Sequence, residues 1–520
     1  MRGCGAMTGQ PGKRQVRRAA GLALALCLVA GATLGQGRGV VPNPVPQTEI
    51  GQGESLRNDT GIRSGVQPDN AGRTNGDQGN GRQNARAAGA TAGGLSLTFG
   101  LASELRADDN YALNEDSSGT AFIFDNTLSF GLLSQTLTDT LRLDASGVVR
   151  LGDFPETGFD SGFEDPTLSL DYIREAADSR LTFDANYRDA DLAFLDPLAE
   201  ADLVTGDLIV DTGTRLTYGV GLRLEIGLDA PFGANFNARR QVREYTDTTA
   251  PELFDTTTDT VGAGLRFRYS GTGEARLNLS QEDYTAKGTR ATDRVTRNIT
   301  LGVAQDLTPV LSLDASIGLT DLDRGAGSPS GSEDGMTGGV GLIRTLTNGT
   351  AGVRFDQTFG VNGERSTLRF SREIELPAGS LSASLGGTKG ETGGTEVVAR
   401  LAYAQDLPRG SFRASVERDA TTNSLDEDVL GTRIGLDYRT DINSLSGLSL
   451  SLDYAITESA GDSAASDRDA ATFAATYTRE LTEDVDLSAG YRHRLRKDNG
   501  DTARSNAVFL TLSRKVTIRP

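Results

Sequence analysis

The chain has 520 residues, a formal net charge of −19 and a mean hydropathy of −0.33, and 37% of its residues are hydrophobic. This acidic balance does not suit nucleic acid, whose binding requires cationic neutralisation of phosphates. After residue 35 no apolar run approaches the roughly 20 residues that a membrane helix needs, so a helical membrane protein is excluded.

Residues 1–35 have the composition of a secretory signal peptide. Basic residues at positions 13–18 precede an apolar stretch at 19–29, and small residues follow, with an A-x-A-like cleavage pattern near Ala32. Cys4 and Cys27 are the two cysteines of the chain, and both lie in this stretch. A processed chain would therefore have no disulfide, thiolate metal site or cysteine nucleophile.

Residues 36–93 form a second segment with a different composition. They are rich in Gly, Asn, Gln, Arg and Pro and contain almost no large apolar residue. Such a segment cannot bury enough apolar surface to offset the entropy lost on ordering. We predict a disordered periplasmic leader that serves either as a plain linker or as a docking segment for a periplasmic partner or peptidoglycan.

From residue 94 to residue 520 the chain repeats one pattern, which residues 294–323 illustrate. Ile299 and Leu301 alternate with Asn298 and Thr300, and the same alternation continues from 311 to 320 after a turn at 306–309. A period of two places alternate side chains on opposite faces of a β-strand. One face is aliphatic and the other is small, polar and charged.

The connections between these segments fall into two classes. Short turns with a shared L-T-x-x-L/V pattern occur at 137–141, 307–311 and 481–485, whereas longer acidic connections occur at 108–119, 153–166, 189–202, 246–259, 321–335, 420–428 and 459–469. Short turns at one end and long loops at the other are typical of outer-membrane barrels. We predict an all-β fold, a transmembrane antiparallel β-barrel of about 22 strands (range roughly 18–26), each about ten residues long.

The signal peptide, the Gly/Gln/Pro-rich leader and the repeated L-T-x-x-L-x-L-x-A hairpins together resemble the β-barrel porin-2 family of Gram-negative outer membranes. The stretch 505–520, SNAVFLTLSRKVTIRP, is similar to the last strand of that family. The resemblance covers residues 95–520 and implies an outer-membrane location. Some members of such families accompany exopolysaccharide export loci, so the resemblance implies location better than task.

Charged residues share the parity of the polar face. An arginine facing lipid at the bilayer midplane costs ~2–4 kcal/mol, so we expect these side chains to face the barrel lumen. They would form either an internal salt-bridge lattice or a charged pore wall that selects solutes. The lumen-facing candidates are Arg142, Arg215, Arg223, Arg239, Arg243, Arg266, Arg268, Arg354, Arg433, Arg439, Arg492, Arg494, Asp314 and Asp453.

The sequence does not predict an enzyme. The single histidine, His493, shares the parity of the apolar row, away from Ser488, and no nucleophile–base pair is evident. We expect no cofactor, no metal site and no nucleic-acid partner. The expected partners are outer-membrane lipid and lipopolysaccharide, the barrel assembly machinery and a periplasmic protein that binds the leader.

The predicted function is a passive, porin-like channel for small hydrophilic solutes in the outer membrane. The alternative is a barrel without an open pore that supports envelope assembly or exopolysaccharide export. A TonB-dependent receptor ranks below both, because residues 36–93 do not have the composition of the folded plug that such a receptor requires.

Overall fold

The computed structural model describes residues 94–195, 198, 211, 213–250, 253–288, 293–325, 331–391, 394–423, 425–460, 467–498 and 501–519. All of them belong to the second of two units of the chain, Glu54–Pro520. The predicted signal peptide at 1–35 and the predicted leader at 36–93 lie outside the described residues.

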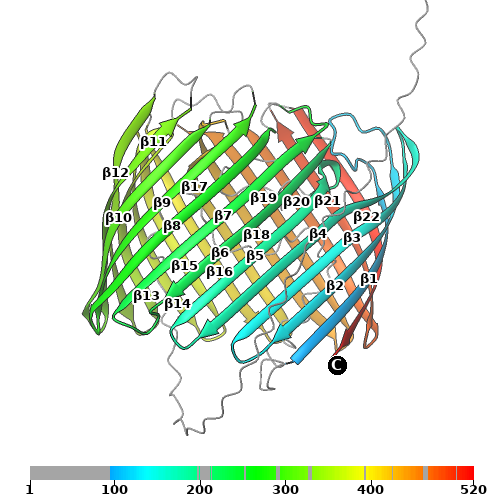
Figure 1. The fold of residues 1–520 in the computed structure, drawn as a ribbon. Helices are drawn as coiled ribbons and strands as arrows, with labels where there is room; N and C mark the ends of the chain where they lie inside the picture. The colour runs from blue at the N-terminus through cyan, green and yellow to red at the C-terminus, as the bar shows by residue number, and fades with distance from the viewer. Residues whose placement is uncertain are drawn as a thin grey trace, which may run out of the picture. The chain divides into compact units, whose positions relative to one another are not determined.

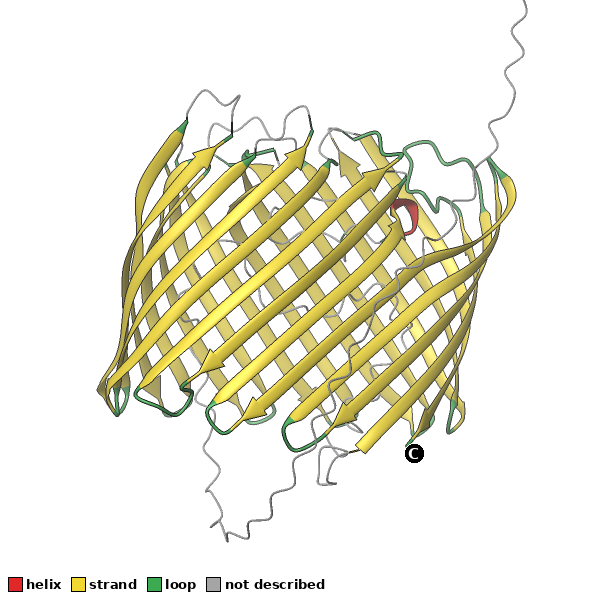
Figure 2. Cartoon of the chain, viewed as in Figure 1, coloured by secondary structure: helices red, strands yellow, loops and turns green. Residues whose placement is uncertain are grey.

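The described residues form one closed sheet of 22 antiparallel strands, in which each strand pairs with the next and β1 pairs with β22 (Figures 1 and 2). The predicted transmembrane β-barrel is therefore confirmed, including its strand number. The strands are β1 (Gly94–Asp108), β2 (Ala121–Gln135), β3 (Asp139–Phe154), β4 (Gly158–Ala176), β5 (Ser179–Asp191), β6 (Thr214–Ile226), β7 (Phe232–Thr246), β8 (Asp255–Ser270), β9 (Gly273–Lys287), β10 (Arg294–Thr308), β11 (Leu311–Arg324), β12 (Ser332–Leu346), β13 (Gly349–Gly360), β14 (Gly363–Leu376), β15 (Gly379–Gly390), β16 (Thr395–Leu407), β17 (Gly410–Thr422), β18 (Asp428–Asn443), β19 (Ser446–Ser459), β20 (Arg468–Thr482), β21 (Val485–Asp498) and β22 (Asp501–Ile518).

The period-two alternation of the sequence produces the two faces of the barrel wall. On β10, Leu301 is 52% exposed on the outer face, whereas Thr300 is 2% exposed on the other face. Comparable exposed aliphatic and aromatic rows run along most strands. In water such rows would be a large apolar surface, and in a membrane they match the hydrocarbon core.

The longest connections lie at one end of the barrel, as predicted, and short turns such as 155–157 and 361–362 also occur at that end. The turns at the other end are short, such as residues 136–138, 271–272 and 309–310. The longer connections lie at the opposite end, and the C-terminus lies at the short-turn end (Figure 1). By the usual arrangement of outer-membrane barrels, the short turns are periplasmic and the long loops extracellular.

Two details of the prediction were wrong. The strands contain 12–19 residues rather than about ten, and most of the predicted loop at 153–166 belongs to β4, which begins at Gly158. About 9–11 residues suffice to cross the bilayer, so the additional length extends the wall beyond it. There the outer face no longer needs to be apolar, and polar residues that resemble a loop continue the strand.

One short 3-10 helix, η1 (Leu192–Phe194), follows β5 and is the start of the connection to β6. Its N-cap residue, Asp191, accepts a hydrogen bond from the backbone N–H of Ala193. Among the described residues, no helix is long and apolar enough to cross a membrane.

Candidate functional site at the barrel mouth

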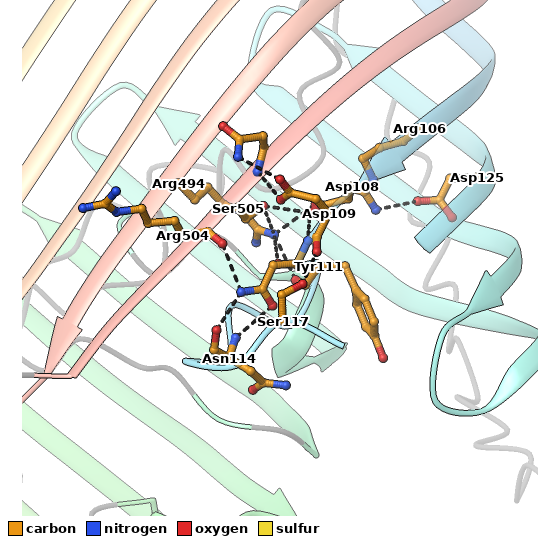
Figure 3. A network of polar contacts seen from close by, with 12 residues as sticks. Arg106, Asp108, Asp109, Tyr111, Asn114, Ser117, Asp125, Arg494, Arg504 and Ser505 are labelled. Carbon is orange, nitrogen blue, oxygen red and sulfur yellow. Dashed lines mark hydrogen bonds and ion pairs between the residues drawn. The ribbon is translucent and has the colours of Figure 1, made fainter. Parts of the chain in front are cut away.

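The β1–β2 connection, residues 109–120, is fixed to the far end of the chain by a buried ion pair. Arg494 on β21 donates to the Asp108 carboxylate at 3.1 Å, and the side chains are 8% and 2% exposed, respectively. Ser505 donates to the other Asp108 oxygen at 2.7 Å, and Arg494 also donates to the Tyr111 carbonyl at 2.9 Å (Figure 3). These bonds join β1, β21 and β22 where the barrel closes, and they hold the connection inward.

An aromatic cluster of Tyr111, Phe154 and Phe194 lies beside this network. The Tyr111 ring is 4.9 Å from the Phe154 ring and 5.3 Å from the Phe194 ring, measured between centroids. The cluster packs on the buried side chains of Ala121 and Ile123 on β2. Because the three rings come from two loops and a strand, their contacts fold both loops against the inner wall.

Arg150 on β3 connects the aromatic cluster to the charged wall. Its guanidinium carbon lies 3.5 Å from the centroid of the Phe194 ring, a cation–π geometry. The same group donates to both oxygens of Asp125, at 2.7 and 3.0 Å. Arg106 on β1 lies 3.6 Å from Asp125 as well (Figure 3). A bidentate pair of this kind fixes the orientation of the Arg150 guanidinium over the Phe194 ring.

The β5–β6 connection reaches strands that are not its neighbours. Beyond Phe194, the side chain of Leu198 packs on Ala455 of β19 and Ala470 of β20. Arg433 on β18 donates to the Leu198 carbonyl at 3.3 Å. A segment that contacts β3 at one point and β18–β20 at another must pass through the interior of the barrel. We call the described residues of this connection, 192–195 and 198, the first bridge.

A second bridge is formed by the β17–β18 connection, of which the structure describes residues 423 and 425–427. Asp426 pairs with Arg294 of β10 at 3.0 Å, and Asp428, the first residue of β18, pairs with Arg365 of β14 at 2.7 Å. Burial raises the pKa of the Asp426 carboxyl, and Arg294 and Arg324 oppose this rise. Both bridges thus lie across the long-loop end and narrow the opening.

Deeper in the barrel, ion pairs cross an intervening strand at a glycine. Asp184 of β5 pairs with Arg239 of β7 at 3.1 Å, and Gly221 of β6 lies between them in register. A Cβ on Gly221 would lie 2.4 Å from an Asp184 carboxylate oxygen. Asp314 of β11 pairs with Arg354 of β13 in the same manner, across Gly341. Glycine in these rows therefore makes room for charged pairs.

The structure distributes the sequence-predicted residues around the barrel and does not gather them in one cluster. Five of the predicted arginines pair with carboxylates: Arg142 with Asp144, Arg239 with Asp184, Arg268 with Glu274, Arg354 with Asp314 and Asp356, and Arg494 with Asp108. Arg266 and Arg433 donate to backbone carbonyl groups, and Arg492 lies 5.7 Å from the Phe509 ring. Arg215 and Arg223 lie on β6, Arg243 on β7, Arg439 on β18 and Asp453 on β19. Their role as the lining of a solute path remains a prediction.

Several residues of the mouth were not among the predicted candidates. Arg106 and Asp108 lie at the start of the acidic connection predicted at 108–119, and Arg294 begins the segment 294–323 that illustrates the repeat. The parity signal was sufficient to assign Arg294 to the polar row, because it has the parity of Asn298. No local signal marked Phe194, since its partners come from β3 and from the β1–β2 connection.

His493 lies where its parity predicted, in the exposed row of Tyr491. Its Nδ1 is 3.0 Å from the Asn506 side-chain oxygen, which also accepts a hydrogen bond from the Tyr491 hydroxyl. In the part of the chain that the structure describes, no three His, Cys, Asp or Glu side chains are grouped so as to hold a metal ion.

The fold resembles solved structures of known receptors. The ferric-catecholate import receptor Fiu of E. coli K12 matches with a TM-score of 0.52 and 11% identity over 82% of each chain. The FrpB iron transporter of Neisseria meningitidis matches with a TM-score of 0.53 and 8% identity, over 84% of this chain and 83% of that one. The protein is an outer-membrane β-barrel. At these identities the likeness concerns the fold alone.

The amino-acid sequence matches no protein-family model and no curated protein. The outer-membrane barrel predicted from the resemblance is confirmed, whereas membership of the porin-2 family remains a prediction.

Proposed function

We propose that the protein is an outer-membrane channel through which small hydrophilic solutes pass between the two bridges. The observation that carries this proposal is the pair of inward-folded loops, held by Arg433 at Leu198 and by Arg294 at Asp426. Outer-membrane channels are selective when charged groups line a narrowed opening. The hydrogen bond at Leu198 and the ion pair at Asp426 fix the two loops to the inner wall, and such loops supply a narrowing of this kind.

The experiment is a conductance measurement on the purified full chain in planar lipid bilayers. We expect discrete current steps in potassium chloride. The variant Asp426→Ala should release the second bridge from Arg294 and increase the step size, whereas the control Asp144→Ala, which removes an exposed pair partner of Arg142 on β3, should not. A folded protein that gives no current steps would overturn the channel proposal.

The alternative is a barrel that supports envelope assembly without an open pore. It is favoured by the density of contacts at the mouth, where the Arg494–Asp108 pair, the aromatic cluster and the first bridge lie close together. This alternative predicts no conductance, together with retention of a periplasmic protein by the full chain that is lost when residues 36–93 are deleted. Conductance from the full chain would exclude it.

A further inference from the structure

One row of the inner wall carries three arginines in succession. Arg492, Arg494 and Arg496 occupy alternate positions of β21, so their side chains share the face on which Arg494 meets Asp108. Successive Cα atoms in such a row are about 6.7 Å apart. We call these three residues the arginine row.

Small residues flank the row on both neighbouring strands. In the register of the sheet each arginine stands between two short side chains, on β20 and on β22. The flanking pairs are Ala474 and Ala507 at Arg492, Thr472 and Ser505 at Arg494, and Ala470 and Ala503 at Arg496. With these short neighbours Arg492 and Arg496 stay partly exposed, whereas Arg494 is 8% exposed and buried in its ion pair with Asp108.

The positive charge of the row exceeds the negative charge that it meets. Arg494 pairs with Asp108. Among the described residues, no carboxylate forms an ion pair with Arg492 or Arg496, and the ring of Phe509 is the contact of Arg492, at 5.7 Å. The neighbouring Asp125 is already engaged by Arg150 and Arg106. An excess of guanidinium groups facing water attracts an anion.

The row also crosses the level of the first bridge. Leu198 packs on Ala470, which is the register partner of Arg496, and Arg492 lies two positions below Arg494 toward the short-turn end. An anion that passes the bridge would therefore meet Arg496 first and Arg492 after it. The arginines at the level of the bridge and below it belong to one strand, β21.

We propose that the arginine row is a binding track for small polyvalent anions, such as di- and tricarboxylates or phosphate esters. The proposal rests on the channel function proposed above and specifies its solute class. Guanidinium groups bind carboxylate and phosphate oxygens in bidentate fashion. Because Arg494 is held by Asp108, Arg496 and Arg492 are the two binding points of the row, and a solute can move from one to the other.

The test is the block of channel current by citrate, together with the reversal potential in a potassium chloride gradient. In the double variant Arg492→Gln/Arg496→Gln the dissociation constant for citrate block should rise about tenfold or more, since each 1.4 kcal/mol of lost binding is tenfold. The reversal potential should shift toward cation selectivity. The control Arg344→Gln removes an arginine from the exposed row of Leu342 on β12 and should change neither quantity.

The outcomes separate the two proposals. Conductance with unchanged citrate block and reversal potential in the double variant would overturn the arginine row and leave the channel standing. If the wild type gives no conductance, the channel proposal fails. Calorimetric titration of the folded full chain in detergent with citrate then decides whether the arginine row binds anions. Citrate binding that is lost only in the double variant supports the row, and no binding by the wild type overturns it.

Discussion

The ion pair between Arg494 and Asp108 joins the first strand to the end of the chain, and the substitution Asp108→Asn tests its importance. The variant keeps the shape of the side chain and removes its charge. Arg494, 8% exposed, then lacks its carboxylate and retains the Ser505 hydroxyl and the carbonyl of Tyr111 as partners. The expected result is a loss of stability where the barrel closes.

The expected loss of unfolding free energy follows from the burial of the Arg494–Asp108 pair. Removing one partner of a buried ion pair costs about 3–5 kcal/mol, because the other charge stays desolvated. The matched control is Asp144→Asn on β3, where Arg142 and Asp144 are 61% and 42% exposed. An exposed pair of this kind contributes about 0–1 kcal/mol. The two variants carry the same chemical change, so their difference measures the effect of burial.

The assay is reversible urea unfolding of the full chain in lipid vesicles, followed by the mobility of folded barrel on unheated gels. A third variant, Asp108→Asn/Arg494→Met, removes both charges and should recover much of the lost free energy. If Asp108→Asn lowers the free energy of unfolding no more than Asp144→Asn does, burial does not decide the effect. If the loss in the double variant equals the sum of the losses in Asp108→Asn and Arg494→Met, the ion pair does not stabilise the closure between β1 and β22.

Three further predictions concern other parts of the barrel. Phe194→Ala removes the ring over Arg150 and should increase single-channel conductance; an unchanged step size would mean that the first bridge does not narrow the path. Leu301→Arg should destabilise the barrel in vesicles by about 2–4 kcal/mol, and a cost no greater than that of Leu301→Ala would contradict the lipid-facing assignment. Gly221→Ala should cost about 1–3 kcal/mol in urea unfolding by displacing Asp184, and this cost should disappear when Asp184 is also replaced by alanine.

The fold could be predicted because its signal is local. Alternation of the kind seen at Asn298, Ile299, Thr300 and Leu301 depends on neighbouring residues only, and a barrel repeats it in every strand. Loop lengths, also local, indicated which ends of the strands lie together. Strand ends were predicted less well, because β4 continues past the bilayer with polar residues that resemble a loop.

The candidate site could be predicted only in part. Parity assigned Arg494 and Arg433 to the polar face, but their partners, Asp108 and the Leu198 carbonyl, lie hundreds of residues away in the sequence. No pattern along one strand encodes such a distance. The acidic stretch after residue 108 looked like an exposed loop, and the structure buries its first carboxylate.

The amino-acid sequence by itself determined a membrane-spanning barrel of about 22 strands, since hydrocarbon outside and polar groups inside impose the same period on each strand. Closure of the sheet decided the rest. Only when β1 meets β22 does Asp108 reach Arg494, and only a curved wall lets the first bridge touch β3 and β19 at once. Contacts across the interior depend on that curvature, which no single strand contains.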